Sequence, residues 1–313
     1  MKGNISRLTR SQWICLVVLA TAVSLWGFPM EAAAEASSGS SPKASELSKT
    51  IRALKWRHMP AHGILLKDLR SGQTLYEFRS HKRLSPASLT KIMSALIILE
   101  YGNLQEEVVV SKHAARAHKI RLRLKTGAVF KLEDLLKAML IVSANDACLA
   151  AVEHVGQDES RFVELMNAKA ADLGLDETHF ANACGFDAPD HYSTAEDLAV
   201  LSETALQNPI FRAFVKQERD LISPVNGTRV YLLRNTNRLL GRVPGVEGVK
   251  TGFTSKAGRC LIAKVSQEGR EVLLVLLGAR RRWTTASALL DYGLKMLELT
   301  APPSEAVSVA DPR

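Results

Sequence analysis

Residues 85–100 read SPASLTKIMSALIILE, and this stretch places a serine and a lysine three residues apart at the start of an apolar run. The pattern predicts a helix over 88–101, on which residues three apart share one face. Lysine is among the side chains least often buried, yet Lys91 lies where this helix turns its apolar face inward. The position of Lys91 therefore points to chemistry as well as to packing.

Ser88 and Lys91 have the residue types of a nucleophile and its base. A serine hydroxyl is a poor nucleophile unless a base lies beside it. A lysine can be that base only when it is neutral, which requires burial or a nearby cation to lower its pKa. Apolar neighbours such as Ile92, Met93 and Leu96 would provide such burial. The spacing alone assigns no function, because serine and lysine meet three apart in many helices whose lysine is exposed.

Two further segments carry polar residues of the same kind. SANDA (143–147) places Ser143 and Asn145 just before a predicted helix over 144–155, where they either point into a common site or cap the helix. KTG occurs at 125–127 and again at 250–252. The first copy follows a basic run and is predicted as a surface turn. The second lies in a strand pattern after both other motifs, so we assign the motif to 250–252.

The three motifs in this order are the set found in penicillin-binding proteins and class A β-lactamases. The sequence resembles the low-molecular-mass serine D-alanyl-D-alanine carboxypeptidases, and the resemblance covers roughly residues 50–298. It extends to RLSPASLTKIMSALIILE (83–100), FVELMNAKAADLGLDETHFANACGFDAPDHYSTAEDLA (162–199), RNTNRLL (234–240), GVEGVKTGFTSKAGRCLIA (245–263) and LLDYGL (289–294). This likeness implies an α+β, β-lactamase/DD-peptidase-like (transpeptidase-like) fold.

The residue patterns independently predict how such a domain is arranged. A hairpin is expected in HGILLKDLRSGQTLYEFR (62–79), with its turn at Arg70–Gly72, and strands are expected in 245–254, 260–266 and 271–279. Helical patterns occupy 132–141, 144–155, 159–173, 194–206 and 283–297. Strands at both ends with helices between them predict a mainly antiparallel sheet flanked by helices, with an inserted helical lobe.

The resemblance also implies roles for matching residues. Ser88 is the nucleophile, Lys91 the general base and Ser143 the proton relay to the leaving amine. Asn145 is expected to hold the substrate amide, and Lys250 and Thr251 its terminal carboxylate. The remaining implied binding residues are Gly252, the backbone of Phe253 (in the oxyanion hole with the Ser88 amide), Thr254 and Arg282. The expected partners are peptidoglycan stem peptides and, as covalent inhibitors, β-lactams.

Three other functions remain open on the same residues. A DD-endopeptidase would cleave cross-linked peptides. A class A β-lactamase would need a glutamate near an asparagine on a loop, and GQDESRFVELMN (156–167) offers Glu164 within a helical pattern. A non-catalytic wall-binding protein would have a degenerate site, although every motif residue is present. Labelled penicillin separates these classes of protein. A stable adduct on Ser88 indicates a peptidase, rapid turnover of penicillin indicates a β-lactamase, and no adduct indicates a wall-binding protein.

Composition and the N-terminus bear on location. The chain has 313 residues, 46% of them hydrophobic, and a net charge of +9, which fits an anionic polymer or membrane surface. Aromatics are only 6% and no nucleic-acid-binding motif occurs, so nucleic acid is not an expected partner. Basic residues before the apolar stretch 13–28 predict a signal peptide over 1–34, cleaved after Ala34 or Ala36; an uncleaved N-terminal anchor is the alternative. We expect an exported, periplasmic or cell-wall-associated protein with no membrane span after cleavage.

The other divisions and the cysteines complete the sequence predictions. Residues 35–49 are expected to be a polar linker, 50–298 the catalytic domain and 299–313 a loose tail. Outside the signal lie Cys148, Cys184 and Cys260, an odd number with no CxxC pair, so neither a disulfide framework nor a metal site is predicted. Cys148 and Cys260 are expected to be buried packing residues, and Cys184 is given no role. No cofactor is expected.

Overall fold

The computed structural model describes residues 61–300. The predicted signal peptide, the linker and nearly all of the predicted tail lie outside these residues. Within residues 61–300, no helix combines the length and the apolarity needed to cross a membrane.

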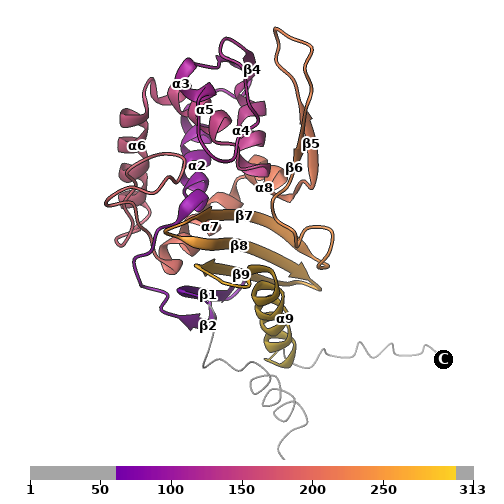
Figure 1. The fold of residues 1–313 in the computed structure, drawn as a ribbon. Coiled ribbons are helices and arrows are strands. Elements are labelled where there is room, and N and C mark those ends of the chain that lie inside the picture. The colour runs from indigo at the N-terminus through magenta and orange to yellow at the C-terminus, as the bar shows by residue number, and fades with distance from the viewer. Residues whose placement is uncertain (1–60, 301–313) are drawn as a thin grey trace, which may run out of the picture. The chain divides into compact units, whose positions relative to one another are not determined.

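One five-stranded antiparallel sheet organises the described residues (Figure 1). Its strand order is β2-β1-β9-β8-β7, so the first two strands of the chain pair with the last three. The strands are β1 (Gly63–Asp68), β2 (Thr74–Phe78), β7 (Val246–Thr254), β8 (Gly258–Gln267) and β9 (Arg270–Leu277). Ile64 of β1 lies opposite Leu276 of β9 in this register. The predicted meeting of the two ends of the domain in one sheet is confirmed.

Helices cover both faces of this sheet. On one side lie α2 (Lys91–Tyr101), α3 (Lys112–Ala115), α4 (Leu132–Ile141), α5 (Asn145–Gly156), α6 (Glu159–Asp172), α7 (Ala195–Gln207) and α8 (Pro209–Lys216), and on the other lies α9 (Arg282–Thr300) (Figure 1). Two small antiparallel pairs flank the helical lobe: β3 (Glu107–Val109) with β4 (Val129–Lys131), and β5 (Arg219–Ile222) with β6 (Tyr231–Arg234).

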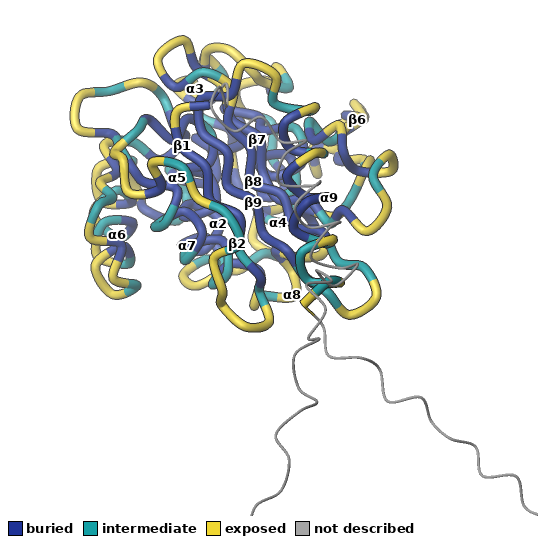
Figure 2. Tube along the Cα trace, turned by 90° about the horizontal axis from the view of Figure 1, so that it is seen from below, coloured by how far each residue is buried: buried dark blue, intermediate teal, exposed yellow. Residues whose placement is uncertain are grey.

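Alternation along the central strands explains why the sheet needs cover on both sides. Leu273 and Val275 of β9 join the core under the helical lobe, whereas Leu274 and Leu276 join the core under α9. A strand buried on both faces reads as a continuous apolar run, as EVLLVLL does here. The buried strands lie at the centre of the tube in Figure 2, between layers of helices.

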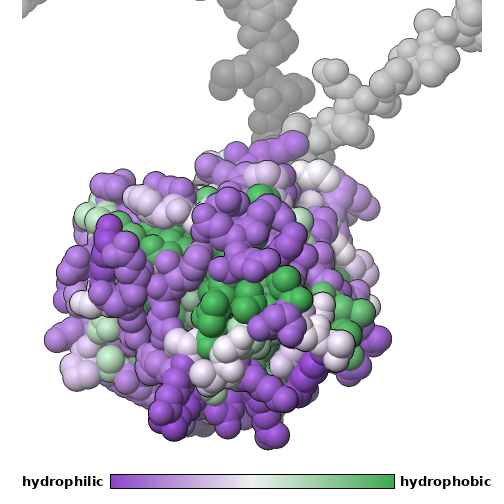
Figure 3. Space-filling model, turned by 90° about the horizontal axis from the view of Figure 1, so that it is seen from above, coloured by the Kyte–Doolittle hydropathy of each residue, from purple (hydrophilic) through white to green (hydrophobic). Residues whose placement is uncertain are grey.

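The ends of the predicted helices agree with the observed ones to within three residues, and the short helix α3 and helix α8 were missed. Helix α8 is the longer of these two. Its sequence carried a signal, because Asn208 caps the helix and Pro209 occupies its first turn. The hairpin of β5 and β6 exposes Leu221, Leu232 and other apolar side chains. Figure 3 shows the face from which this hairpin projects, with apolar patches set among hydrophilic side chains.

Candidate active site

Ser88 lies in a single 3-10 turn, η2 (Ala87–Thr90), that leads directly into α2. Ala87 has φ +51°, a left-handed conformation that non-glycine residues rarely adopt. Strand β7 approaches this turn closely at Gly252, where a Cβ atom would lie 3.2 Å from the Ser88 amide nitrogen. Gly252 therefore allows the strand that carries the second KTG to run against the serine turn.

The amine of Lys91 is completely buried and lies beside the serine. Its Nζ is 3.2 Å from Ser88 Oγ and 2.9 Å from Asn145 Oδ1, and it also contacts the carbonyl oxygen of Cys184. Burial lowers the pKa of Lys91 to about 7. The predicted proximity of serine and lysine is confirmed, and at neutral pH a substantial fraction of this amine is a free base.

The SAN segment contributes two different side chains. Ser143 has φ +67° and is buried, and its Oγ has no hydrogen-bond partner among the described residues although it lines the pocket. Asn145 is held by two hydrogen bonds: its Oδ1 accepts from Lys91, and its Nδ2 donates to the His118 carbonyl at 2.7 Å. Neither residue caps α5 with its side chain. The capping interpretation is therefore wrong. Asn145 holds the base lysine, and its expected contact with a substrate amide stays a prediction.

The second KTG brings another buried cation to the site. Lys250 is 1% exposed, and its Nζ donates to the Thr251 carbonyl at 3.1 Å. Burial lowers the pKa of Lys250 well below its usual value, and the nearby charges of Lys91 and Arg282 lower it further. Thr251 lines the pocket, and its hydroxyl lies 2.6 Å from that of Thr236. The first KTG forms an exposed turn, as predicted.

The remaining predicted binding residues divide according to the face of β7. Thr251 and Phe253 face the pocket, whereas Thr254 has the alternate orientation and is buried. Its hydroxyl donates to Asp187 Oδ1 at 2.6 Å, so the structure does not bring Thr254 into the pocket. Arg282 does line the pocket; its Nη1 donates to the carbonyls of Gly252 and Cys260, both at 2.9 Å. Burial lowers the pKa of Arg282 to about 10.

The cysteine prediction requires a correction. Cys148 of α5 and Cys184 form a disulfide, so the conclusion that no disulfide was present is wrong. The odd cysteine count concealed the pair, because Cys260 is the buried free thiol that remains. This disulfide ties the helix that begins with Asn145 to the residue whose carbonyl accepts from Lys91. Sequence analysis gave no role to Cys184, although its backbone is part of the site.

His191 is a second residue that the sequence analysis missed. Its Nδ1 accepts from the Ala181 amide, so its Nε2 carries the proton and donates to Thr90 Oγ1 at 2.9 Å. Thr90 donates in turn to the Ala87 carbonyl at 2.8 Å. Burial lowers the pKa of His191 to about 4, which keeps the ring neutral. This chain of hydrogen bonds supports the left-handed residue that precedes the nucleophile.

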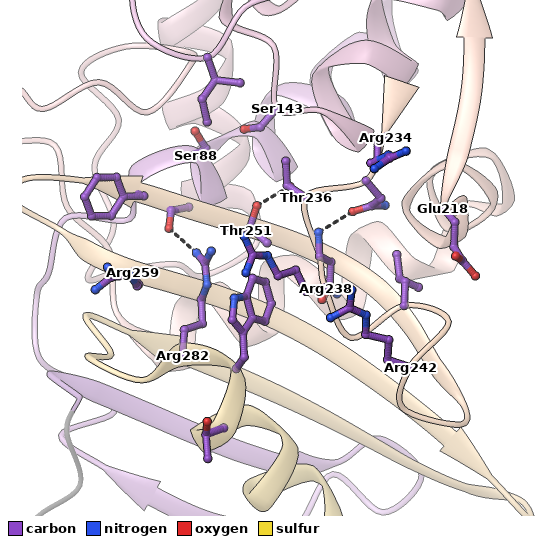
Figure 4. Close-up of a pocket in the computed structure, with 18 of the residues that line it drawn as sticks. Ser88, Ser143, Glu218, Arg234, Thr236, Arg238, Arg242, Thr251, Arg259 and Arg282 are labelled. Carbon is purple, nitrogen blue, oxygen red and sulfur yellow. Dashed lines mark hydrogen bonds between the residues drawn. The ribbon is translucent and has the colours of Figure 1, made fainter. Parts of the chain in front are cut away.

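These side chains border one pocket of about 1020 Å³ (Figure 4). Ser88, Ser143, Thr251 and Arg282 all face it, whereas Lys91 and Lys250 lie behind its wall. Glu164 is an exposed residue of α6 and does not line it. Glu164 therefore cannot be the glutamate that activates water in a class A β-lactamase.

A cluster of potential metal ligands found among the described residues lies outside the pocket. Among residues 61–300, Glu77, His81 and Glu196 bring potential ligand atoms within 4.8 Å of one another, away from the residues that line the pocket. Glu77 and His81 are exposed, and Glu77 already accepts a hydrogen bond from Ser80. Exposed acidic groups are common without an ion, so this cluster assigns no metal to the site.

Comparison with known proteins defines the class to which this fold and site belong. The family profile described as D-alanyl-D-alanine carboxypeptidase, Peptidase_S11, matches residues 49–281. The chain is 34% identical over 246 residues to D-alanyl-D-alanine carboxypeptidase DacF of Bacillus subtilis, a match that covers 76% of this chain and 63% of the relative. It is 32% identical over 279 residues to DacC of Escherichia coli, covering 83% and 67%. The chain thus spans about two thirds of the length of these relatives.

Solved structures agree with this result. A D-alanyl-D-alanine carboxypeptidase from Mycobacterium tuberculosis superposes with a TM-score of 0.71 at 31% identity, covering 79% of this chain and 93% of that one. A DD-transpeptidase from Streptomyces gives 0.71 at 29% identity, covering 75% and 97%. The predicted fold class is confirmed, and the chain belongs to the D-alanyl-D-alanine carboxypeptidase family, peptidase S11.

Proposed function

We propose that this chain is a serine-type D-Ala-D-Ala carboxypeptidase that removes the terminal D-alanine from peptidoglycan pentapeptide stems through an acyl-enzyme. The observation that carries the proposal is the buried Lys91 amine, 3.2 Å from Ser88 Oγ in the wall of an open pocket. Family membership supports the same activity.

Acylation begins with the amine of Lys91. A neutral amine has two N–H groups and one lone pair, and three oxygen atoms surround this one. The Asn145 and Cys184 oxygens accept its two N–H groups, so the lone pair faces Ser88 Oγ. Lys91 takes the serine proton as Oγ attacks the carbonyl of the D-Ala–D-Ala bond. The amides of Ser88 and Phe253 stabilise the oxyanion; loss of such a donor typically costs about 10²–10³ in rate.

The leaving D-alanine needs a proton at its amine and a positively charged site for its carboxylate. Ser143 Oγ, which is unpartnered within the described residues, relays the proton to the departing nitrogen. Thr251 faces the terminal carboxylate in the pocket, with the charges of Arg282 beside it and Lys250 behind it. Water then hydrolyses the Ser88 ester and restores the enzyme. The Thr254 hydroxyl donates to Asp187 and accepts from the Ala257 amide, and these bonds fix the end of β7.

A β-lactam presents a carbonyl to the same nucleophile. Opening of its ring forms the same ester, but the departing nitrogen stays attached to the acyl group and obstructs the attacking water. Penicillin is therefore expected to remain bound to Ser88 as a stable adduct.

The test uses the mature protein, radiolabelled or fluorescent penicillin, and a pentapeptide stem. The wild-type chain should release D-alanine and form a stable penicillin adduct on Ser88, and Ser88→Ala should do neither. Labelling of Ser88→Ala at the wild-type rate would contradict the assignment. Rapid turnover of penicillin would indicate a β-lactamase, and the absence of any adduct a wall-binding protein.

The location follows from the proposed substrate. Peptidoglycan lies outside the cytoplasmic membrane, and the N-terminal pattern of basic, apolar and small residues predicts an exported protein. We place the mature chain in the periplasm or at the cell wall. N-terminal sequencing of protein from the producing cell should begin at residue 35 or 37; an intact Met1 in extracytoplasmic protein would indicate an uncleaved anchor.

A further inference from the structure

The pocket carries more positive charge than the proposed reaction uses. Eight arginines line it, and its one acidic lining residue is Glu218, a formal excess of seven positive charges. The proposed reaction uses the charge of Arg282 alone among these arginines. Four others lie on β5, β6 and the loop before β7, all of them exposed, and we call them the arginine wall: Arg219, Arg234, Arg238 and Arg242.

Two members of the arginine wall face each other across a strand pair. In the antiparallel register of β5 and β6, Arg219 lies directly opposite Arg234. Cβ atoms at such positions are about 4.5–5.5 Å apart, and like charges placed there destabilise a sheet. Within residues 61–300, the arginines that form ion pairs are Arg83 and Arg270, which lie outside the pocket. The repulsion in the arginine wall is therefore not compensated by the described protein, as expected where a ligand supplies the negative charge.

A buried side chain beside the arginine wall points to a ligand independently of charge. Asn237 is 3% exposed and lines the pocket. Its Oδ1 accepts from the Leu239 amide at 3.0 Å, which fixes the orientation of the side chain. Its Nδ2 then has no hydrogen-bond acceptor among the described residues. A buried donor without an acceptor costs free energy, which an oxygen atom of a bound anion would recover.

The shape of the site selects the kind of anion. The arginines line a pocket of about 1020 Å³, and the buried Asn237 donor can be reached only from within it. A flat bilayer surface cannot enter such a pocket, whereas a thin chain can. Figure 4 shows Arg234, Arg238 and Arg242 in succession on the side of Thr251 opposite Ser88. A succession of cations is matched by an anion that repeats its charge along its length.

Phosphate suits these donors better than a single carboxylate does. A guanidinium presents five N–H donors in a planar fork and pairs with phosphate through two parallel hydrogen bonds. A chain of phosphates offers a charge and free oxygen atoms at every unit, so it can engage several arginines at once. A peptide stem carries its carboxylates singly.

We propose that the arginine wall and Asn237 bind a linear phosphate polymer, a polyphosphate or phosphodiester chain, beside the active site. The inference goes beyond the proposed function, because this binding requires no acylation of Ser88. A bound chain occupies part of the pocket onto which Ser88 opens. The polymer should therefore hold the protein in place and compete with a peptide substrate for the pocket.

Binding is measured on the mature chain and on Ser88→Ala, so that the result does not depend on the reaction. The probes are long-chain inorganic polyphosphate, pyrophosphate and polyglutamate at the same concentration of charge. Long-chain polyphosphate should bind most tightly, and equally to both proteins. Pyrophosphate that binds as tightly as the polymer would show a site for a single small anion and overturn the inference. Polyglutamate that binds as tightly would show attraction to any polyanion and also overturn it.

The variant Arg219→Gln/Arg234→Gln removes the opposed pair of the arginine wall. Its matched control, Arg70→Gln/Arg161→Gln, removes two exposed arginines that lie outside the pocket. Because two charge-assisted contacts are lost, the first variant should bind polyphosphate about tenfold or more weakly. The control should bind it as the wild type does. An equal loss in both variants, or in neither, would overturn the inference.

Asn237→Asp tests the buried donor. Aspartate keeps an oxygen that accepts from the Leu239 amide and places a second oxygen where Nδ2 lies, and the neighbouring arginines favour its charged form. Polyphosphate binding should fall about tenfold or more, because a donor is replaced by a negative charge. Labelling by penicillin checks that the variant is folded. A folded variant that binds polyphosphate as the wild type does would overturn the inference.

Two further measurements separate this site from a membrane contact and from the proposed function. Vesicles with anionic headgroups serve as the second probe for Arg219→Gln/Arg234→Gln. If this variant lost vesicle binding but kept polyphosphate binding, the arginine wall would be a bilayer contact and the inference would be wrong. Polyphosphate should slow penicillin acylation of the wild type more than that of the variant. A chain that acylates normally but binds no polyphosphate refutes this inference alone, whereas one that binds polyphosphate but never acylates refutes the proposed function alone.

Discussion

The two ends of the pocket use positive charge in opposite ways. At the Ser88 end, Lys91 and Lys250 are buried, and burial lowers the pKa of each amine. At the other end, Arg238 and Arg242 are exposed to solvent, where a guanidinium keeps its charge. Burial makes the Lys91 amine available as a base, whereas exposure keeps the two guanidinium groups charged and available to bind an anion. The side chain alone does not decide the role; its access to water does.

The largest effect should come from placing a guanidinium, the group found at the exposed end, at the buried position 91. Lys91→Arg replaces an amine that can lose its proton with a guanidinium that cannot. Loss of a general base costs up to about 10⁴-fold, and we expect acylation by labelled penicillin to fall by about that factor. Lys125→Arg, in the exposed copy of KTG, is the control and should label normally. Acylation of Lys91→Arg within tenfold of wild type would mean that another group is the base.

Lys250→Met removes the second buried cation while keeping most of its volume. Because the positive group behind the carboxylate position is lost, acylation should fall by about 10²–10³, the usual cost of removing one preorganised electrostatic group. Lys125→Met provides the same change in the identical tripeptide on the surface. Equal rates in the two variants would show that the KTG of β7 is not part of the site.

The pH dependence tests whether burial has made Lys91 a base. Its pKa is lowered to about 7, so the amine is charged and inactive below that pH and neutral above it. At pH 5 about 1% of the amine is free, and penicillin acylation should be about 100-fold slower than its plateau near pH 8. Stopped-flow acylation across this range gives the profile, with Ser88→Ala as the blank. A flat profile from pH 5 to 8 would contradict the role.

The disulfide should have the smallest effect on chemistry and a clear one on stability. Cys148→Ala/Cys184→Ala releases the loop whose carbonyl orients Lys91. We expect acylation to slow by about tenfold or less, and the free energy of unfolding to fall by about 2–4 kcal/mol. Denaturant titration and penicillin labelling measure the two effects, with and without reductant. Cys260→Ala is the control: it keeps the disulfide, so it should match the wild type without reductant and lose the same stability on reduction. Wild-type protein whose stability is unchanged by full reduction would contradict the prediction.

Local patterns predicted the elements that carry the chemistry, because helix and strand periodicity and motif spacing are local properties. They placed Ser88 beside Lys91 and chose the correct copy of KTG from its strand context. Strand alternation could also have shown that Thr254 points away from Thr251. The protein partners of Asn145, Lys91 and the His118 carbonyl, were not predicted because tertiary packing sets them. The disulfide joins residues 36 apart in the sequence, so no local pattern reveals it.

The pairing of β1 with β9 determines when the central sheet can form during synthesis of the chain. Ile64 finds its partner only when Leu276 has been made, so most of the domain must be synthesised before the sheet closes. The KTG strand lies at the far edge of that sheet, and Arg282 follows its last strand. A nascent chain thus carries Ser88 early but lacks the wall that completes its pocket, so the proposed acylation of Ser88 requires synthesis to have passed residue 282.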